Sequence, residues 1–140
     1  MATFNKFQDF SEQLVLGIYD FDTNVFKVML TNVAPVATNT VKANLTEISA
    51  GNGYTAGGNT TTITVSETTG TTTVSGTQVV FTASGGTMAT FQYVVLYNDS
   101  ATNKNLVGWW DNGSTVSLAD TETFTVKFSN TSPGAIFTLA

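Results

Sequence analysis

Carboxylates are the residues of this chain whose type and spacing come nearest to catalytic chemistry. Asp111, Asp120 and Glu122 lie close together in the sequence, around an expected hairpin turn at 111–113. A glycosidase uses two carboxylates that face each other across a sugar cleft. Each of these three residues instead occupies a position typical of a turn or of the start of a strand, and the pattern predicts no aromatic-lined cleft. We therefore expect no catalytic residue here.

Three residue types that many enzymes and metal sites need are absent from the chain. Its 140 residues include no His, no Cys and no Arg. This composition excludes a Ser–His–Asp triad, a thiolate zinc or iron–sulfur site, a disulfide framework and the bidentate Arg contact to phosphate. A Lys would have to serve as the base for a Ser or Thr nucleophile, and Lys42, Lys104 and Lys127 have the pattern of ordinary surface positions. The sequence therefore predicts a protein that is not an enzyme.

Two loops match known ligand sites only in part. Residues 20–24 have the D-x-D-x-N opening of a calcium loop, but an EF-hand would need Gly in place of Val25 and Glu in place of Thr31. We expect a solvated turn there, with an adventitious ion as the alternative. Residues 51–58 are rich in glycine, yet they lack the Lys of a phosphate loop and precede Thr/Val strand sequence. We expect no metal and no cofactor, and a loop that supports assembly contacts.

The adjacent pair Trp109 and Trp110 is the feature closest to a sugar-binding platform. Neighbouring side chains of a β-strand point to opposite faces of the sheet. We therefore expect one tryptophan in the core and the other facing outward or into an interface. Carbohydrate binding by the pair is the alternative.

Short runs of β-branched and aromatic residues, separated by turn residues, dominate the chain after Gly17. This pattern predicts an all-β fold, an antiparallel β-sandwich or jelly-roll-like domain, with all of residues 1–140 in one domain. Within the Thr-rich stretch 60–77, Ile and Val alternate with Thr. This pattern favours ordered peripheral strands over disorder. The clearest expected strands are 25–31, 45–48, 60–65, 71–74, 79–83, 91–97, 106–110, 123–128 and 135–139.

The N-terminal stretch has a different periodicity from the strands. Phe4, Phe7, Phe10 and Leu14 recur every three or four residues, which predicts a short amphipathic helix over about 4–13. We expect residues 1–16 to form a helical arm. Its phenylalanines would cover one end of the core or dock on a partner chain.

The charge balance bears on the possible partners. Ten acidic residues against five Lys give a net charge of −5. An acidic surface repels the phosphate backbone, so we expect no nucleic-acid partner. Residues 1–9 lack the pattern of a secretory signal, and the longest apolar runs are far shorter than the ~20 residues that cross a bilayer. We expect no membrane association.

Several strings of this sequence together resemble a family of small tailed-bacteriophage virion proteins, the head decoration or cement proteins. None of the strings is a catalytic motif, and they extend over most of the chain. They are residues 4–7, 26–35, 45–58, 93–98, 106–111 and 134–140.

The resemblance implies a non-enzymatic protein that binds the assembled head shell and stabilises it. It implies the major capsid protein as partner, self-association as a homotrimer, synthesis in the bacterial host cytoplasm and a place on the outer capsid surface. A tail-fibre or receptor-binding β-sandwich module that recognises host polysaccharide is the alternative. The expected contact residues are Phe4, Phe7, Phe10, Tyr54, Trp109 and Trp110.

Overall fold

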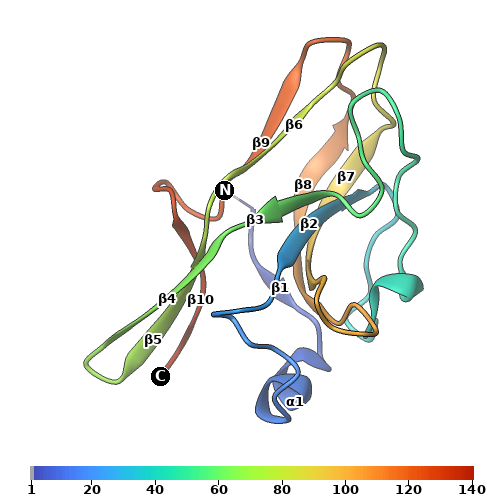
Figure 1. Cartoon of the computed structure of the whole chain (residues 1–140). Coiled ribbons are helices and arrows are strands. Elements are labelled where there is room, and N and C mark those ends of the chain that lie inside the picture. Colours follow the sequence, from blue (N-terminus) through green and yellow to red (C-terminus); the bar gives the residue numbers. More distant parts are fainter. Residues whose placement is uncertain (1) are drawn as a thin grey trace.

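The computed structural model describes residues 2–140 and confirms an all-β, sandwich-like fold with antiparallel sheets and one short α-helix (Figure 1). No helix among the described residues has the length and apolar character needed to span a membrane. The elements are β1 (Asn5–Lys6), α1 (Phe10–Val15), β2 (Phe26–Thr31), η1 (Lys42–Asn44), β3 (Asn59–Thr61), β4 (Ile63–Thr68), β5 (Thr71–Gly76), β6 (Val79–Thr82), β7 (Phe91–Asn98), β8 (Leu106–Val116), β9 (Thr123–Val126) and β10 (Gly134–Leu139).

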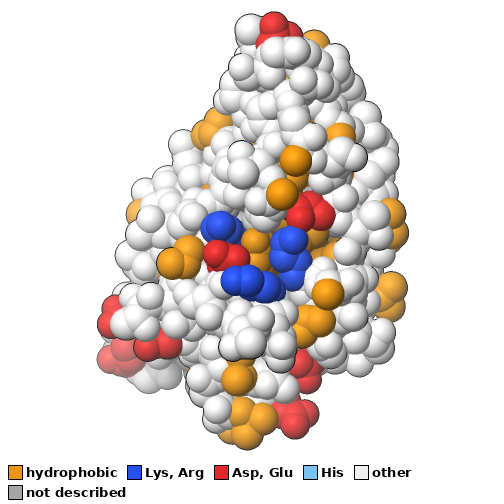
Figure 2. All heavy atoms as spheres, turned by 45° about the vertical axis from the view of Figure 1, so that its right-hand side comes forward, with side chains coloured by type: hydrophobic (Ala, Val, Ile, Leu, Met, Phe, Trp, Pro, Cys, Tyr) orange, Lys and Arg blue, Asp and Glu red, His pale blue; other side chains and the backbone are white. Residues whose placement is uncertain are grey.

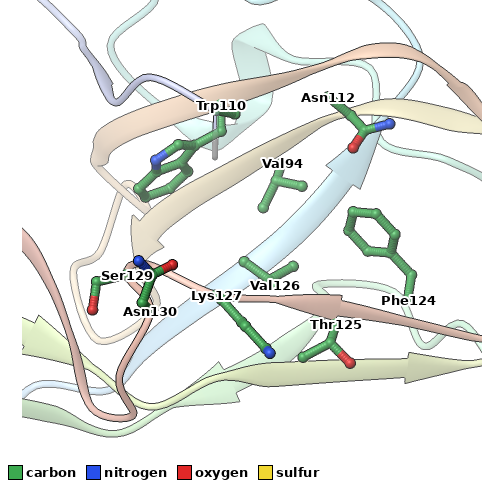
Figure 3. Close-up of a pocket in the computed structure, with 10 residues that line it drawn as sticks. Val94, Trp110, Asn112, Phe124, Thr125, Val126, Lys127, Ser129 and Asn130 are labelled. Carbon is green, nitrogen blue, oxygen red and sulfur yellow. The ribbon is translucent and has the colours of Figure 1, made fainter.

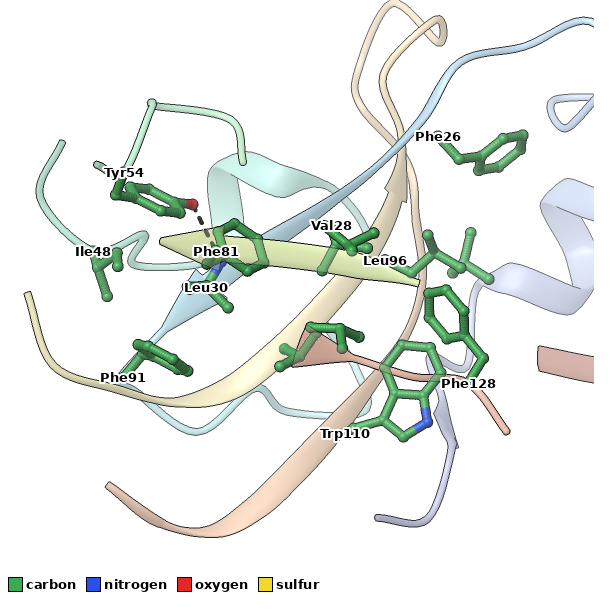
Figure 4. Packing of buried hydrophobic residues seen from close by; sticks show 14 of the residues in the cluster. Phe26, Val28, Leu30, Ile48, Tyr54, Phe81, Phe91, Leu96, Trp110 and Phe128 are labelled. Atoms are coloured by element: carbon green, nitrogen blue, oxygen red, sulfur yellow. Dashed lines mark hydrogen bonds between the residues drawn. The ribbon is translucent and has the colours of Figure 1, made fainter. Parts of the chain in front are cut away.

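The largest sheet has five strands in the order β1-β8-β7-β2-β3. Two smaller sheets, β10-β5-β4 and β6-β9, lie against one of its faces. Alternate side chains of β2 and β7, including Val28, Leu30, Val94 and Leu96, point toward these smaller sheets and form the main core with their residues. Figure 4 shows this core from close by.

The opposite face of the large sheet carries a second, smaller core. Met29, Val95, Tyr97 and Leu106 are buried there together with Phe7. The segment between β2 and β3, which includes η1, runs across this face. The central strands are therefore buried on both faces, which explains why β7 is a nearly continuous apolar run.

The helix expected over 4–13 is wrong in its extent. Residues 5–6 form β1, which pairs with β8 at the edge of the large sheet, and α1 begins only at Phe10. Phe4 packs against the main core, Phe7 is buried in the second core and Phe10 returns to the main core. This segment wraps around the sheet edge, so its phenylalanines reach both faces, which one straight helix could not achieve.

Two other local expectations have different outcomes. The Thr-rich stretch is ordered, as expected, and forms the projecting β4–β5 hairpin in Figure 1. The hairpin turn expected at 111–113 is wrong, because β8 continues through these residues to Val116. Asp111 pairs with Tyr93 while Val116 pairs with Phe91, so residues 112–115 lie opposite Gln92 alone and form a large bulge in β8.

Candidate functional site

Most of the six expected contact residues lie inside the protein and not on its surface. Phe7, Phe10 and Tyr54 are each at most 3% exposed, and Trp110 is 8% exposed. Only Phe4 and Trp109 are half-buried. Their aromatic side chains fill the two cores because the N-terminal segment and the glycine-rich loop fold back onto the sheet. Four of the six residues therefore have no free surface to offer a partner in this conformation.

The two tryptophans lie on opposite faces of β8, as strand geometry predicts. Trp110 belongs to the main core, where its ring centroid lies 5.2 Å from that of Phe128. Trp109 packs on the second core, with its ring centroid 4.5 Å from that of Phe7. They cannot form one flat stacking platform, so a sugar site made by the pair is not supported.

An apolar rim, made of Val15, Leu16 and Leu139, is exposed at the end of the molecule where α1 meets β10. These side chains are 86%, 65% and 59% exposed. Beside them, a hollow between α1 and β10 is lined by Phe4, Phe10, Leu14, Phe137 and Leu139, among other residues. Sequence periodicity pointed to the phenylalanines of this region, whereas the exposed side chains are the aliphatic ones that follow them.

A polar network holds the glycine-rich loop. The Tyr54 hydroxyl donates a 2.7 Å hydrogen bond to Oε1 of Glu47. It also accepts a 3.2 Å bond from the Leu30 amide, which is dashed in Figure 4. Oε1 of Glu47 also accepts from the Gly57 amide, and Oε2 lies 2.6 Å from Nζ of Lys42. Partial burial opposes ionisation of Glu47, but these donors outweigh it and lower its pKa. Burial raises the pKa of Tyr54 far above its ordinary value.

The lysine face consists of Lys27, Lys42, Lys104, Asp99 and Glu47, which come from distant parts of the chain. Nζ of Lys27 and Nζ of Lys104 lie 3.3 and 3.2 Å from the two carboxylate oxygens of Asp99. Figure 2 shows these charges around a small apolar floor. No local motif predicts this cluster, because it exists only after the sheet has formed.

A groove of about 350 Å³ opens between β8 and β9 (Figure 3). Val94 and Val126 form its floor, and Trp110 and Phe124 stand at its two ends. Its remaining lining residues are Ala2, Asn112, Thr125, Lys127, Ser129 and Asn130. The groove thus joins an aromatic and apolar interior to a polar rim.

The carboxylates considered for catalysis serve separate turns. Asp111 accepts from Nε2 of Gln92 at 2.9 Å, and this bond, followed by one from the Gly113 amide, lowers its pKa. Asp120 accepts from the Gly85 amide, and Glu122 accepts from the Ala119 amide. Each carboxylate therefore has its own, separate hydrogen-bond donors.

The turn at residues 20–24, which opens like a calcium loop, also has a carboxylate that accepts hydrogen bonds from nearby residues. Asp20 accepts hydrogen bonds from the Thr23 hydroxyl and from the amides of Asp22 and Thr23, and these bonds lower its pKa. Within residues 2–140, no group of three or more acidic residues is placed to hold a metal ion.

Comparisons with protein-family models, curated proteins and solved structures found no match for this chain.

Proposed function

We propose that this protein is a bacteriophage head decoration protein that binds the assembled shell and stabilises it without catalysing a reaction. The observation that carries the proposal is the apolar rim, since Val15 is 86% exposed and Leu16 is 65% exposed at one end of the molecule. An exposed group of large aliphatic side chains is typical of a surface that becomes buried against another protein. The resemblance to phage virion proteins supplies the partner, the major capsid protein.

The proposed mode of action is linkage between binding and shell assembly. A protein that binds the assembled shell, and not its free subunits, stabilises the shell by mass action. The framework that presents the rim is well suited to this task, because the large sheet is buried on both faces. We further propose, by analogy with the resembled family, a homotrimer on the outer capsid surface.

The proposal is tested with particles that lack this chain and with variants added back to them. We expect particles without the chain to break at lower temperature and under milder osmotic shock. Replacing Val15 and Leu16 together by Gln should weaken shell binding by at least about tenfold, because fully burying a Val or Leu side chain contributes about 1.5–3 kcal/mol. The control replaces Val33 and Val36, which are 55% and 57% exposed elsewhere, by Gln. Equal resistance with and without the chain would refute the proposal.

A second candidate function, recognition of host polysaccharide by a tail-fibre or receptor-binding module, is favoured by the groove between β8 and β9. Its apolar floor and the amides of Asn112 and Asn130 suit a pyranose, which has apolar faces and hydroxyl edges. Trp109→Phe makes Trp110 the only tryptophan and so a reporter for this groove. Saccharide-dependent change in its fluorescence, abolished by Asn130→Ala, would support this function. A glycan array without any bound saccharide would exclude it.

A further inference from the structure

Three of the five lysines of this acidic chain lie together on the lysine face. Lys27 lies in β2, Lys42 in η1 and Lys104 in the loop between β7 and β8. Their side chains are 29%, 26% and 43% exposed, so they are partly covered and still reach solvent. Figure 2 shows basic and acidic side chains gathered on one face of the molecule. Lys42 and Lys104 line a hollow. The fold therefore concentrates positive charge at one place on a chain of net charge −5.

The acidic residues of this face leave one positive charge uncompensated. Asp99 is shared between Lys27 and Lys104, and Glu47 pairs with Lys42. Three ammonium groups thus face two carboxylates, whereas the rest of the chain has two lysines against eight acidic residues. An ammonium has three donors. Nζ of Lys42 donates to Glu47, and Nζ of Lys104 contacts both the carboxylate and the backbone carbonyl oxygen of Asp99, so each lysine retains a donor for another acceptor.

The hollow between these lysines has room for such an acceptor. Lys42, Glu47 and Lys104 line it. The other lining residues are uncharged and come from η1, from the residues on either side of η1 and from the β7–β8 loop. Nζ of Lys42 also lies 5.9 Å from the ring centroid of Tyr97, which is buried beneath it. The neutral lining residues are Val41, Ala43, Leu45, Thr102 and Asn103.

We infer that the lysine face binds an acidic segment of a partner polypeptide, whose carboxylates bridge Lys42 and Lys104. This inference rests on the proposed function, for which it names the chemistry of the partner surface. A short acidic segment fits the charge pattern better than a nucleic acid does. A long polyanion would extend beyond the small positive area onto the rest of the chain, which carries two lysines and eight acidic residues, and be repelled.

The inference is tested by titrating the full chain with a hexaglutamate peptide at low salt and recording backbone amide chemical shifts. We expect shifts confined to the surroundings of Leu45 and residues 102–104. Lys104→Gln should weaken the affinity about twofold to fivefold, the range for one exposed ion pair, and Lys104→Arg should restore it. Raising the salt until the Debye length is about 8 Å should also weaken binding.

Lys127→Gln is the matched control, because it changes the net charge equally at an exposed position outside the lysine face. An oligothymidylate of equal charge tests the other class of polyanion. The inference is overturned if hexaglutamate causes no shifts, if Lys104→Gln and Lys127→Gln have equal effects, or if the oligonucleotide binds the lysine face more tightly. Because the titration uses no virion, its failure leaves the proposed shell binding intact. Failure of shell binding, in turn, does not alter the titration.

Discussion

The hydroxyl of Tyr54 donates a 2.7 Å hydrogen bond to Oε1 of Glu47, which joins the glycine-rich loop to the segment that follows η1. The same hydroxyl accepts from the Leu30 amide of β2. Tyr54 is 3% exposed, and the Glu47 side chain is 17% exposed. The bond from the Leu30 amide is therefore buried and the bond to Glu47 is partly buried. This tyrosine therefore holds the loop to the sheet and has almost no exposed surface in this conformation.

Tyr54→Phe should lower the free energy of unfolding by about 1–3 kcal/mol, because it leaves buried groups without their partner. Urea denaturation measures the change. Tyr93→Phe, at a half-buried position of β7, is the control and should change stability by less than about 0.5 kcal/mol. Equal effects of the two substitutions would contradict the structural role of the Tyr54 hydroxyl.

Glu47 should make the protein less stable in acid. Its pKa in the folded state lies below the ordinary value of 4.5, so its contribution is fully present above that value and is lost as the pH falls through the lower, folded-state pKa. Thermal unfolding between neutral and acidic pH should therefore show a shallower decline of Tm in Glu47→Gln than in the wild type. Parallel curves for the two proteins would show that this carboxylate does not contribute.

Gly108 should be intolerant of a side chain. A Cβ at this position would lie 2.1 Å from Cε2 of Phe4 and 2.7 Å from the carbonyl oxygen of Asn5. Gly108→Ala should destabilise the protein by about 1–3 kcal/mol and displace β1. Amide hydrogen exchange at Phe7, which bonds to Val107, would report the displacement. Adding Phe4→Ala should recover part of the loss, and strict additivity of the two changes would contradict the proposed clash.

The two tryptophans should differ in their solvent exposure. Trp109→Phe leaves the buried Trp110, whose fluorescence should be blue-shifted and poorly quenched by acrylamide. Trp110→Phe leaves the half-buried Trp109, which should emit at longer wavelength and be quenched more readily. Identical spectra for the two variants would contradict the difference in burial between Trp109 and Trp110.

Strand periodicity carries much of the fold information in this sequence. The apolar, β-branched and aromatic run 91–97 predicts a strand that matches β7. The period-two geometry of a strand also predicts that Trp109 and Trp110 point to opposite faces, as they do. The spacing of Phe4, Phe7 and Phe10 predicts a helix over 4–13, and this prediction is wrong in its extent. A segment that wraps around a sheet edge also places aromatic residues at every third position, so the spacing does not distinguish the two structures. The lysine face could not be predicted, since its lysines are brought together only by the tertiary fold.

The central claim is that this chain decorates a phage head, and density maps of particles with and without the chain test it most directly. We expect density matching this domain to disappear only from the outer head surface, and the end bearing Val15 and Leu16 to face the shell. Density lost from the tail or its fibres, or no difference between the two maps, would contradict it.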